Sequence, residues 1–396
     1  MTKKLLTTAL CSLLITIGGA DLVQAASFQV TRTSVVTGLG NPRHMSFGPD
    51  GALYITEAGV GGTEVQGIFA PGVNANMDGG RSGRLLRLLP NGSKEVVLDN
   101  LPSFVVSGTN GSQGYGIHDL AFDAQGNGYM LIGGGVNVGF RNTVGALGED
   151  LGYLFQIDVD TGKTTKLFDF TAYEDTNNPD GKDLISNIYG LAIQGDTIAV
   201  VDAGGNDILF WDKNTQKVEQ LQVFPLRTAG ASQFQAVPTT VDIGLDGAYY
   251  VSQLTGFPYP MGKAQVYRLA APNTPANVYA DGFTQVIDLD FDRHGNLYVL
   301  EVAQQPLPTQ IPFGSLIKVA PDGTRTTLVA QGLIYPTGLE VTPDGSSIYV
   351  ANRGFLGNNL GEIVRLDITS VPEARTLWGV LSFASVGLLY KKLNQM

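Results

Sequence analysis

The sequence predicts an all-β protein, a six-bladed β-propeller, and three observations lead to this prediction. First, one pattern recurs six times: an apolar strand, a tight turn around a glycine, and a second strand of alternating apolar and small polar residues. Second, successive turn glycines lie about 70 to 75 residues apart early in the chain and about 50 apart later, a period typical of propellers and solenoids. Third, most copies continue into a third and a fourth strand, which makes a propeller blade. The turn glycines are Gly51, Gly126, Gly195, Gly247, Gly295 and Gly345.

The strands are expected in the same order in every copy. The first hairpin occupies 41–59, and the later hairpins begin near residues 116, 189, 239, 286 and 336. Third strands are predicted to begin at Gly83, Gly152, Asp207, Ala264, Gly314 and Gly361. The last copy stops at Ile368 without a fourth strand, whereas residues 28–39 have the pattern of an outer strand. We therefore expect the N-terminal strand to complete the last blade and remove an open sheet edge.

Composition excludes several functions. The 396 residues include 51 glycines, 15 tyrosines and 18 phenylalanines but only 15% charged residues, so a large folded core is expected. A net charge of -11 provides no basic surface for a phosphate backbone, so nucleic acid is not an expected partner. The single cysteine, Cys11, lies in a predicted N-terminal signal. The mature chain is therefore expected to have no disulfide and no thiolate chemistry.

Both ends of the chain carry predicted targeting segments. Residues 1–26 combine two lysines, a short apolar run and small residues at a cleavage point, as a secretory signal peptide does. Residues 370–396 contain a run of about 14 apolar residues followed by two lysines, which suits transient association with a membrane. The alternative for this tail is an amphipathic segment packed on the fold. With the propeller at 27–369, the protein is expected to be exported to the periplasm or the cell surface.

Long loops indicate which face of the propeller is functional. The predicted connections between second and third strands are long at 58–82, 133–151, 255–263 and 303–313, whereas the opposite face carries tight turns. An extra connection at 171–186 falls on the same face as the long loops. A binding surface therefore belongs on the loop-rich face.

Polar residues are predicted to ring the channel mouth on that face. The candidate ligand-binding residues are Arg43, His44, His118, Asp119, Tyr189 and Asp288 from first strands, with Glu57, Asp202 and Glu301 from the ends of second strands. Carboxylates and imidazoles around a channel can hold Ca²⁺ or another divalent cation, or act as general acids and bases. The alternative is that these side chains bond to backbone and hold adjacent blades together.

Residues 173–187 form a second candidate site. Asp175, Asp180 and Asp183 are candidate Ca²⁺ ligands because oxygen-rich loops bind calcium. The spacing differs from that of an EF-hand, since Pro179 takes the fifth position and no glutamate closes the loop. The alternative is a turn rich in Asp and Asn that binds no metal.

Aromatic residues in the long loops predict an apolar platform for a flat ligand. They are Phe69, Phe140, Phe257, Tyr259 and Phe313. The alternative for some of them is that they pack the loops against the blades. No catalytic residues can be assigned, because there are only three histidines and no Gly-x-Ser-x-Gly motif.

The blade pattern GLGNPRHMSFGPDGALYITEAG, followed by segments such as GEIVRLDI, resembles NHL-type six-bladed propellers. More closely, residues 35–354 are similar to the ScyD/ScyE family of cyanobacterial secreted proteins associated with synthesis of the pigment scytonemin. The most distinctive segment is NNPDGKDLISNIYGLAI. At Arg43-His44 that family is expected to have Arg-Gly. The tail resembles PEP-CTERM sorting signals, with Ala374 in place of the second proline.

Three functions are consistent with these features. The family resemblance implies an exported propeller that binds a small aromatic ligand and assists synthesis of a scytonemin-type pigment. A resemblance to other six-bladed propellers implies a metal-dependent lactonase or related hydrolase, with His44, His118, Asp119 and Asp288 around the ion. The third is a non-catalytic surface module that binds an exported protein partner.

Overall fold

The computed structural model describes residues 27–308 and 313–371. The predicted signal peptide (1–26) lies outside these residues, and so does the predicted sorting tail beyond residue 371. The chain divides into one compact unit, Val30–Thr369, and a second made of the terminal segments. No helix within the described ranges is long and apolar enough to cross a membrane.

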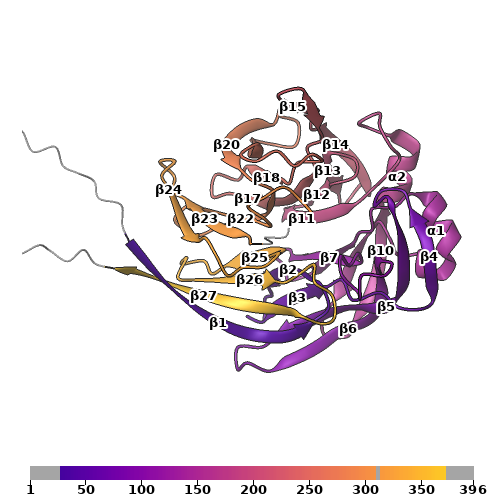
Figure 1. The fold of residues 1–396 in the computed structure, drawn as a ribbon, viewed down its shortest axis with the longest axis horizontal. Coiled ribbons are helices and arrows are strands. Elements are labelled where there is room, and N and C mark those ends of the chain that lie inside the picture. The colour runs from indigo at the N-terminus through magenta and orange to yellow at the C-terminus, as the bar shows by residue number, and fades with distance from the viewer. Residues whose placement is uncertain (1–26, 309–312, 372–396) are drawn as a thin grey trace, which may run out of the picture. The chain divides into compact units, whose positions relative to one another are not determined.

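The described residues form six antiparallel sheets of four or five strands, which we call blades 1 to 6 (Figure 1). Blade 1 contains β2 (Pro42–Phe47), β3 (Leu53–Glu57), β5 (Ala75–Leu88) and β6 (Lys94–Val106), with β4 (Val65–Ala70) also paired to β5. Blade 2 contains β7 (Ile117–Phe122), β8 (Gly128–Ile132), β9 (Tyr153–Asp158) and β10 (Lys163–Asp169). Blade 3 contains β11 (Ile188–Gln194), β12 (Thr197–Asp202), β13 (Asp207–Asp212) and β14 (Lys217–Val223).

The second half of the chain follows the same order. Blade 4 contains β17 (Pro238–Ile243), β18 (Tyr249–Gln253), β19 (Ala264–Leu269) and β20 (Asn277–Phe283). Blade 5 contains β21 (Val286–Phe291), β22 (Leu297–Glu301), β23 (Ser315–Val319) and β24 (Arg325–Val329). Blade 6 contains β25 (Gly338–Val341), β26 (Ser347–Asn352), β27 (Gly361–Val371) and β1 (Ser27–Leu39).

The innermost strands close a ring. Strand β2 contacts β7, β7 contacts β11, and the series continues through β17, β21 and β25, which contacts β2 again. Six sheets arranged radially around a channel are a β-propeller, so the predicted fold class is confirmed (Figure 1).

The N-terminal strand completes the last blade, as the sequence predicts. Strand β1 pairs with β27, so the first and last described strands lie side by side (Figure 1). Arg32 donates to the Glu362 carboxylate of β27 at 2.9 Å. Leu39 and Val36 are buried with Ile363 against blade 1. This pairing covers the edge that β27 would otherwise expose.

The tight turns form because aspartate and glycine occupy fixed positions. In five hairpins the turn aspartate accepts a hydrogen bond from the backbone N–H two residues later, as Asp50 does from Ala52 at 3.1 Å. The following glycine then takes a left-handed conformation, with φ of 75° at Gly51. Glycine adopts this conformation without the steric penalty of a side chain, which explains the recurring turn motif.

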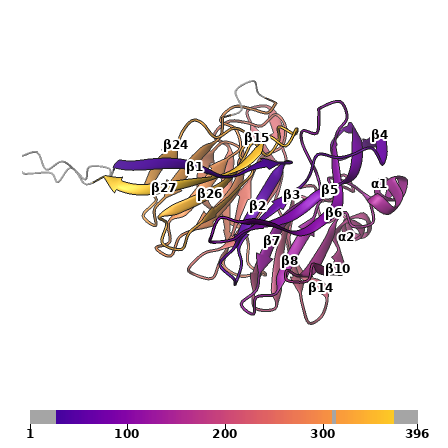
Figure 2. The same cartoon turned by 90° about the horizontal axis from the view of Figure 1, so that it is seen from below.

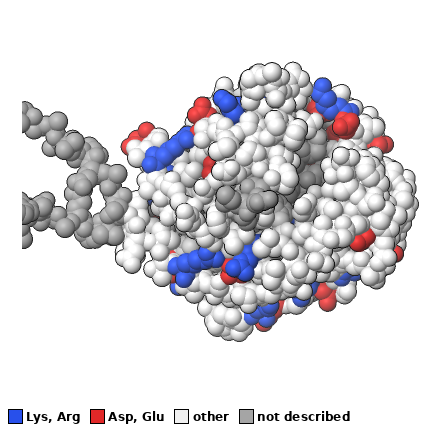
Figure 3. All heavy atoms as spheres, viewed as in Figure 1, with Lys and Arg blue, Asp and Glu red and all other residues white. Residues whose placement is uncertain are grey.

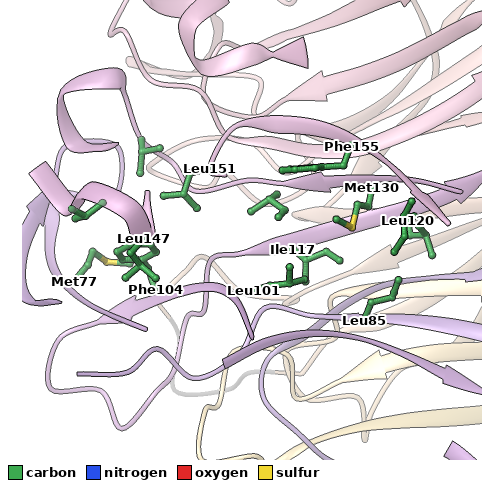
Figure 4. Close-up of a cluster of buried hydrophobic side chains, with 14 of the residues drawn as sticks. Met77, Leu85, Leu101, Phe104, Ile117, Leu120, Met130, Leu147, Leu151 and Phe155 are labelled. Carbon is green, nitrogen blue, oxygen red and sulfur yellow. The ribbon is translucent and has the colours of Figure 1, made fainter. Parts of the chain in front are cut away.

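Apolar clusters fill the interfaces between neighbouring blades. Successive side chains of a strand point to opposite faces of its sheet. In β8, therefore, Met130 and Ile132 pack toward blade 1, whereas Tyr129 and Leu131 pack toward blade 3. Figure 4 shows the cluster between blades 1 and 2. Because both faces of a blade are buried near the channel, second strands such as β8 are apolar on both faces, whereas outer strands such as β10 and β14 are largely exposed and polar.

The long connections contain small elements of their own. Helix α1 (Val138–Val144) begins at Asn137, whose side chain accepts from the Phe140 N–H, and the short η1 (Gly145–Leu147) follows. Helix α2 (Phe170–Asn177) is capped by Asp169 in the same way. A hairpin of β15 (Arg227–Ala229) and β16 (Ser232–Phe234) precedes blade 4. Figure 2 shows β4 and β15 on the same side of the blades.

Candidate functional site

A cavity of about 650 Å³ lies at the channel mouth on the loop-rich face. Its floor comes from the innermost strands of blades 1 to 5, which supply Arg43, His118, Tyr189, Thr239 and Ile287. Loop residues form its walls: Tyr115, Leu254, Tyr259, Leu307, Tyr335 and Phe355. In Figure 3, which shows this face, the visible charged side chains lie mainly toward its edge.

Arg43 places a buried positive charge at the cavity floor. Its guanidinium donates to the carbonyl oxygens of Gly354 at 2.6 Å and of Gly114, and it lies 4.7 Å from the centroid of the Phe355 ring. The side chain is 2% exposed, and its Nε–H has no partner. Burial lowers the pKa of Arg43, whereas Tyr189 and Tyr115 raise it, and the charge is held by carbonyl dipoles and an aromatic ring. It therefore remains available to an anionic ligand.

His118 offers a neutral hydrogen-bond acceptor. Its Nδ1 lies 3.0 Å from the carbonyl oxygen of Ile188. That oxygen can only accept, so Nδ1 carries the proton and Nε2, which is buried without a partner, is left with a free lone pair. Burial first, and then the Arg43 charge, lower the pKa of His118 to about 3. At neutral pH the ring therefore accepts a hydrogen bond from a ligand N–H or O–H.

Two tyrosines add donors to the same floor. The Tyr189 hydroxyl is buried without a partner, and its ring lies 4.6 Å from the His118 ring, centroid to centroid. Burial raises the pKa of Tyr115 to about 12, although the Arg43 guanidinium opposes this rise. Burial also raises the pKa of Tyr189. Both phenols stay protonated at neutral pH and can donate hydrogen bonds.

His44, Asp119 and Asp288 meet inside the channel. The His44 Nδ1 lies 3.6 Å from Asp119 Oδ1 and 3.7 Å from Asp288 Oδ2, so the structure brings together three residues that the sequence placed in one ring. Burial lowers the pKa of His44 despite the neighbouring carboxylates, and its ring is neutral at neutral pH.

These carboxylates hold blades together. Each accepts one backbone N–H from its own strand and one from the next blade at 2.7 to 2.8 Å, Asp119 from Leu120 and Leu191, Asp288 from Leu289 and Leu339. Each oxygen of both groups thus has a backbone donor, and no three His, Cys, Asp or Glu side chains of the described residues, these included, are grouped as metal ligands.

Other channel residues make similar contacts between blades. The hydroxyls of Thr56, Thr239 and Thr337 each donate to a carbonyl of the next blade, at 2.6 to 3.0 Å. At Gly190 the backbones meet directly, since a Cβ there would lie 2.8 Å from the Thr240 Cα. Much of the predicted ring is therefore architectural.

The predicted second ring lies outside the cavity. Glu57 accepts from the Gly40 N–H and pairs with Arg84 at 2.7 Å. Asp202 accepts the Asn187 N–H, and Glu301 the Thr284 N–H, both at 2.6 Å. In each case a second-strand carboxylate fixes the backbone that leads into the first strand of its own blade. None of these three carboxylates lines the cavity.

The opposite end of the channel is acidic, which sequence reasoning missed. Asp242, Asp290 and Glu340 line a hollow of about 340 Å³ at the end with the tight turns. Burial raises the pKa of Asp242 to about 6 and that of Glu340 to about 8. These residues occupy the same position in the first strands of blades 4, 5 and 6. The signal was therefore present in the repeat alignment, because each acid lies two residues after the position that Asp288 occupies in blade 5.

The acidic segment 173–187 is divided by the structure. Asp175 is exposed on α2, and Asp183 is exposed. Asp180 accepts hydrogen bonds from the Lys182 N–H at 2.8 Å and from Asn206 Nδ2 at 3.0 Å. Throughout the described residues, no three His, Cys, Asp or Glu side chains are grouped as metal ligands. The buried acid of this segment is Glu174, which the sequence analysis did not select.

The loop aromatics take different positions. Tyr259 lines the cavity, and Phe257, which is 78% exposed, lines a second hollow of about 700 Å³ that shares Tyr115, Asn187 and Tyr259 with the first. Phe140 is a buried residue of α1. Phe69 and Phe313 are exposed outside both hollows.

Unusual backbone conformations gather around the cavity. Five non-glycine residues that line one or both hollows have positive φ, including the β-branched Val237 at 52° and Thr255 at 73°. The others are Gln113, Tyr259 and Tyr335. Side chains disfavour this region, and such strain concentrates at functional sites. Together with the unpartnered polar atoms, it marks this cavity as the candidate ligand site.

No protein-family model matches the sequence, and no curated protein matches it. Among solved structures, a gluconolactonase from Xanthomonas campestris is similar over 86% of this chain and 90% of its own, with 11% identity and a TM-score of 0.48. The PQQ domain of pyranose dehydrogenase from Coprinopsis cinerea is similar over 87% and 98%, with 12% identity and a TM-score of 0.46. A chain of a nidogen/laminin complex is similar over 70% and 84%, with 14% identity and a TM-score of 0.44. Similarity at this level does not identify a ligand or a reaction.

Proposed function

We propose that this propeller binds a flat aromatic molecule that carries an acidic group, in the cavity at the channel mouth. The observation that carries the proposal is the cavity floor, where Arg43 Nε, His118 Nε2 and the Tyr189 hydroxyl are all buried without partners among the described residues. An unpaired buried polar atom costs about 1–3 kcal/mol, so a ligand that pairs with these atoms recovers free energy.

The three atoms define the ligand. An anionic oxygen accepts hydrogen bonds from Arg43 and Tyr189, and a neighbouring N–H or O–H donates to His118 Nε2. The rest of the ligand lies among the rings of Tyr115, Tyr259 and Phe355, where aromatic groups pack favourably. The cavity volume of about 650 Å³ suits a ligand of a few fused or linked rings.

The family resemblance extends this proposal to a biological role. A protein similar to the ScyD/ScyE family would act after export, as an accessory protein that binds an indolic or phenolic precursor of a scytonemin-type pigment. Deleting the gene in its source organism should then leave a precursor unprocessed. Normal pigment output in the deletion strain would contradict this role without affecting the proposal of aromatic binding.

Calorimetry with three matched probes tests the binding proposal. Indole-3-acetate should bind, and indole-3-acetamide should bind roughly tenfold or more weakly, because hydrogen bonds to charged groups are worth about 1.5–3 kcal/mol. Cyclohexaneacetate, which keeps the charge but lacks the aromatic ring, should also bind more weakly. Equal affinities for the three probes, or no binding of indole-3-acetate by folded protein, would overturn the proposal.

A further inference from the structure

Helix α2 and strand β13 of blade 3 contribute a second group of buried polar atoms. Asp207, at the start of β13, is fully buried, and neither of its carboxylate oxygens has a partner. Glu174 of α2 is 3% exposed, and its Oε1 has no partner either. Three buried carboxylate oxygens without donors in one place require something that the protein does not itself provide.

The carboxylates converge on one point. A methyl group added at Gly205 would lie 3.3 Å from Glu174 Oε2, 3.4 Å from Asp207 Oδ1 and 3.5 Å from the Asp202 carboxyl carbon. Gly205 therefore forms the base of a small cradle with acidic walls. Asp202 itself is held in place, because it accepts from the backbone N–H groups of Gly204 and Gly205 at 2.9 and 3.0 Å.

Among the residues that the structure describes, no positive side chain acts on Asp207 or Glu174. The groups that act electrostatically on Asp207 are Asp202, Glu174 and Asp180, all of them acidic. Burial and these neighbours raise the pKa of Asp207, and burial raises that of Glu174 to about 8. The group is therefore either neutralised by protons or occupied by a cation.

The fold does not require an acid at this position. Asp207 pairs with Asp202, the last residue of the second strand, and the residues in the corresponding register of blades 1, 2, 5 and 6 are Arg84, Tyr153, Ser315 and Glu362. Blade 6 also has a carboxylate at this position, but Glu362 pairs with Arg32 at 2.9 Å, whereas the Asp207 carboxylate has no partner among the described residues and α2 supplies a second acid.

We propose that Glu174 and Asp207 bind a divalent cation of the calcium type in this cradle. Both side chains offer only oxygen, the donor that Ca²⁺ prefers, and two carboxylates neutralise its charge. No three His, Cys, Asp or Glu side chains of the described residues are grouped as metal ligands, so Glu174 and Asp207 supply only part of the coordination shell. Water or backbone carbonyl groups supply the remaining ligands. Only Glu174 comes from the oxygen-rich segment 173–187 that suggested calcium in the sequence, and the predicted ligands Asp175, Asp180 and Asp183 are not part of the proposed pair.

Thermal unfolding of the chelator-treated mature protein, titrated with CaCl₂, tests this site. Calcium should raise the melting temperature of the wild type by several degrees, because it binds the folded state. The variant Asp207→Asn should lose this response, and so should Gly205→Ala, which keeps every carboxylate but fills the cradle. The control Asp175→Asn, an exposed change on the same helix, should respond as the wild type does.

Terbium provides a readout that does not depend on stability. The Tyr173 phenol lies close enough to Asp207 and Glu174 for their charges to raise its pKa further, so it can transfer excitation energy to a bound Tb³⁺. Wild-type protein should show this luminescence and lose it on adding Ca²⁺, and Asp207→Asn should show none. A wild type without a calcium response, or an Asp207→Asn variant that responds equally, would overturn the proposal. If the wild type shows no calcium response and Asp207→Asn is more stable than the wild type, the buried carboxylates are neutralised by bound protons.

Discussion

Single residues of the cavity floor combine a cost in stability with a use in binding. Tyr189 shows this most clearly, because its ring is packed against His118 while its hydroxyl is buried without a partner. A residue selected only for packing would be phenylalanine. Under the proposed function the hydroxyl takes part in recognition, so its removal should affect affinity and stability differently.

The variant Tyr189→Phe tests this separation. We expect its affinity for indole-3-acetate to fall by about threefold to tenfold, since one hydrogen bond is worth about 0.5–1.5 kcal/mol. Its free energy of unfolding should be unchanged or higher, because an unpaired buried hydroxyl is removed. Calorimetry and chemical denaturation measure the two quantities. The matched control is Tyr349→Phe, on β26 and outside both hollows, which should leave affinity unchanged. A Tyr189→Phe variant that binds normally but is less stable would contradict a role in recognition.

At the scale of elements, the sequence repeat made the blade strands predictable, but it did not predict the structure of the connections between them. A strand buried on both faces, such as β8, must be apolar, and an Asp-Gly turn must follow the first strand, so hairpins can be read from the sequence. The ring of Arg43, His118 and Tyr189 was predictable because repeat alignment places these residues at one level. Tyr115 and Phe355 were not, because loops that bring them into the cavity have no repeat to align. Helices α1 and α2 are too short for their periodicity to show, and α2 is the element that buries Glu174.

Strand β1 also makes a prediction at this scale. Leu39 is fully buried in the cluster that joins blade 6 to blade 1. Leu39→Ala should therefore lower the free energy of unfolding by about 2–5 kcal/mol, the usual cost of a large cavity in a core. Thr37→Ala, an exposed change two residues earlier in the same strand, should stay within about 0.5 kcal/mol of the wild type. Urea denaturation compares the two, and equal effects would show that β1 does not hold the ring closed.

At the scale of the whole molecule, the channel has two electrically different ends. Arg43 and neutral imidazole and phenol groups line the loop-rich end, whereas Asp242, Asp290 and Glu340 line the other. An acidic ligand is therefore favoured at the first end and repelled by the second. The same distribution buries several carboxylates inside the ring, and their protonation links the stability of the propeller to pH.

The last prediction concerns this link. Burial raises the pKa of Glu340 from 4.5 to about 8 and that of Asp288 from 3.8 to about 7, so the folded state keeps protons that the unfolded chain has released. The stabilisation is complete below the unfolded pKa values and is lost as pH rises through the folded ones. His118 acts in the opposite direction, but only below its ordinary pKa of 6.5.

The melting temperature should therefore fall from pH 6.5 to 8, with Glu340 contributing about 2 kcal/mol. Glu340→Gln keeps an acceptor for the Phe47 N–H, so its decline should be shallower and its stability at pH 8 higher. Calorimetric melting in a chelating buffer measures both proteins, and parallel curves would show that Glu340 is already ionised in the folded state.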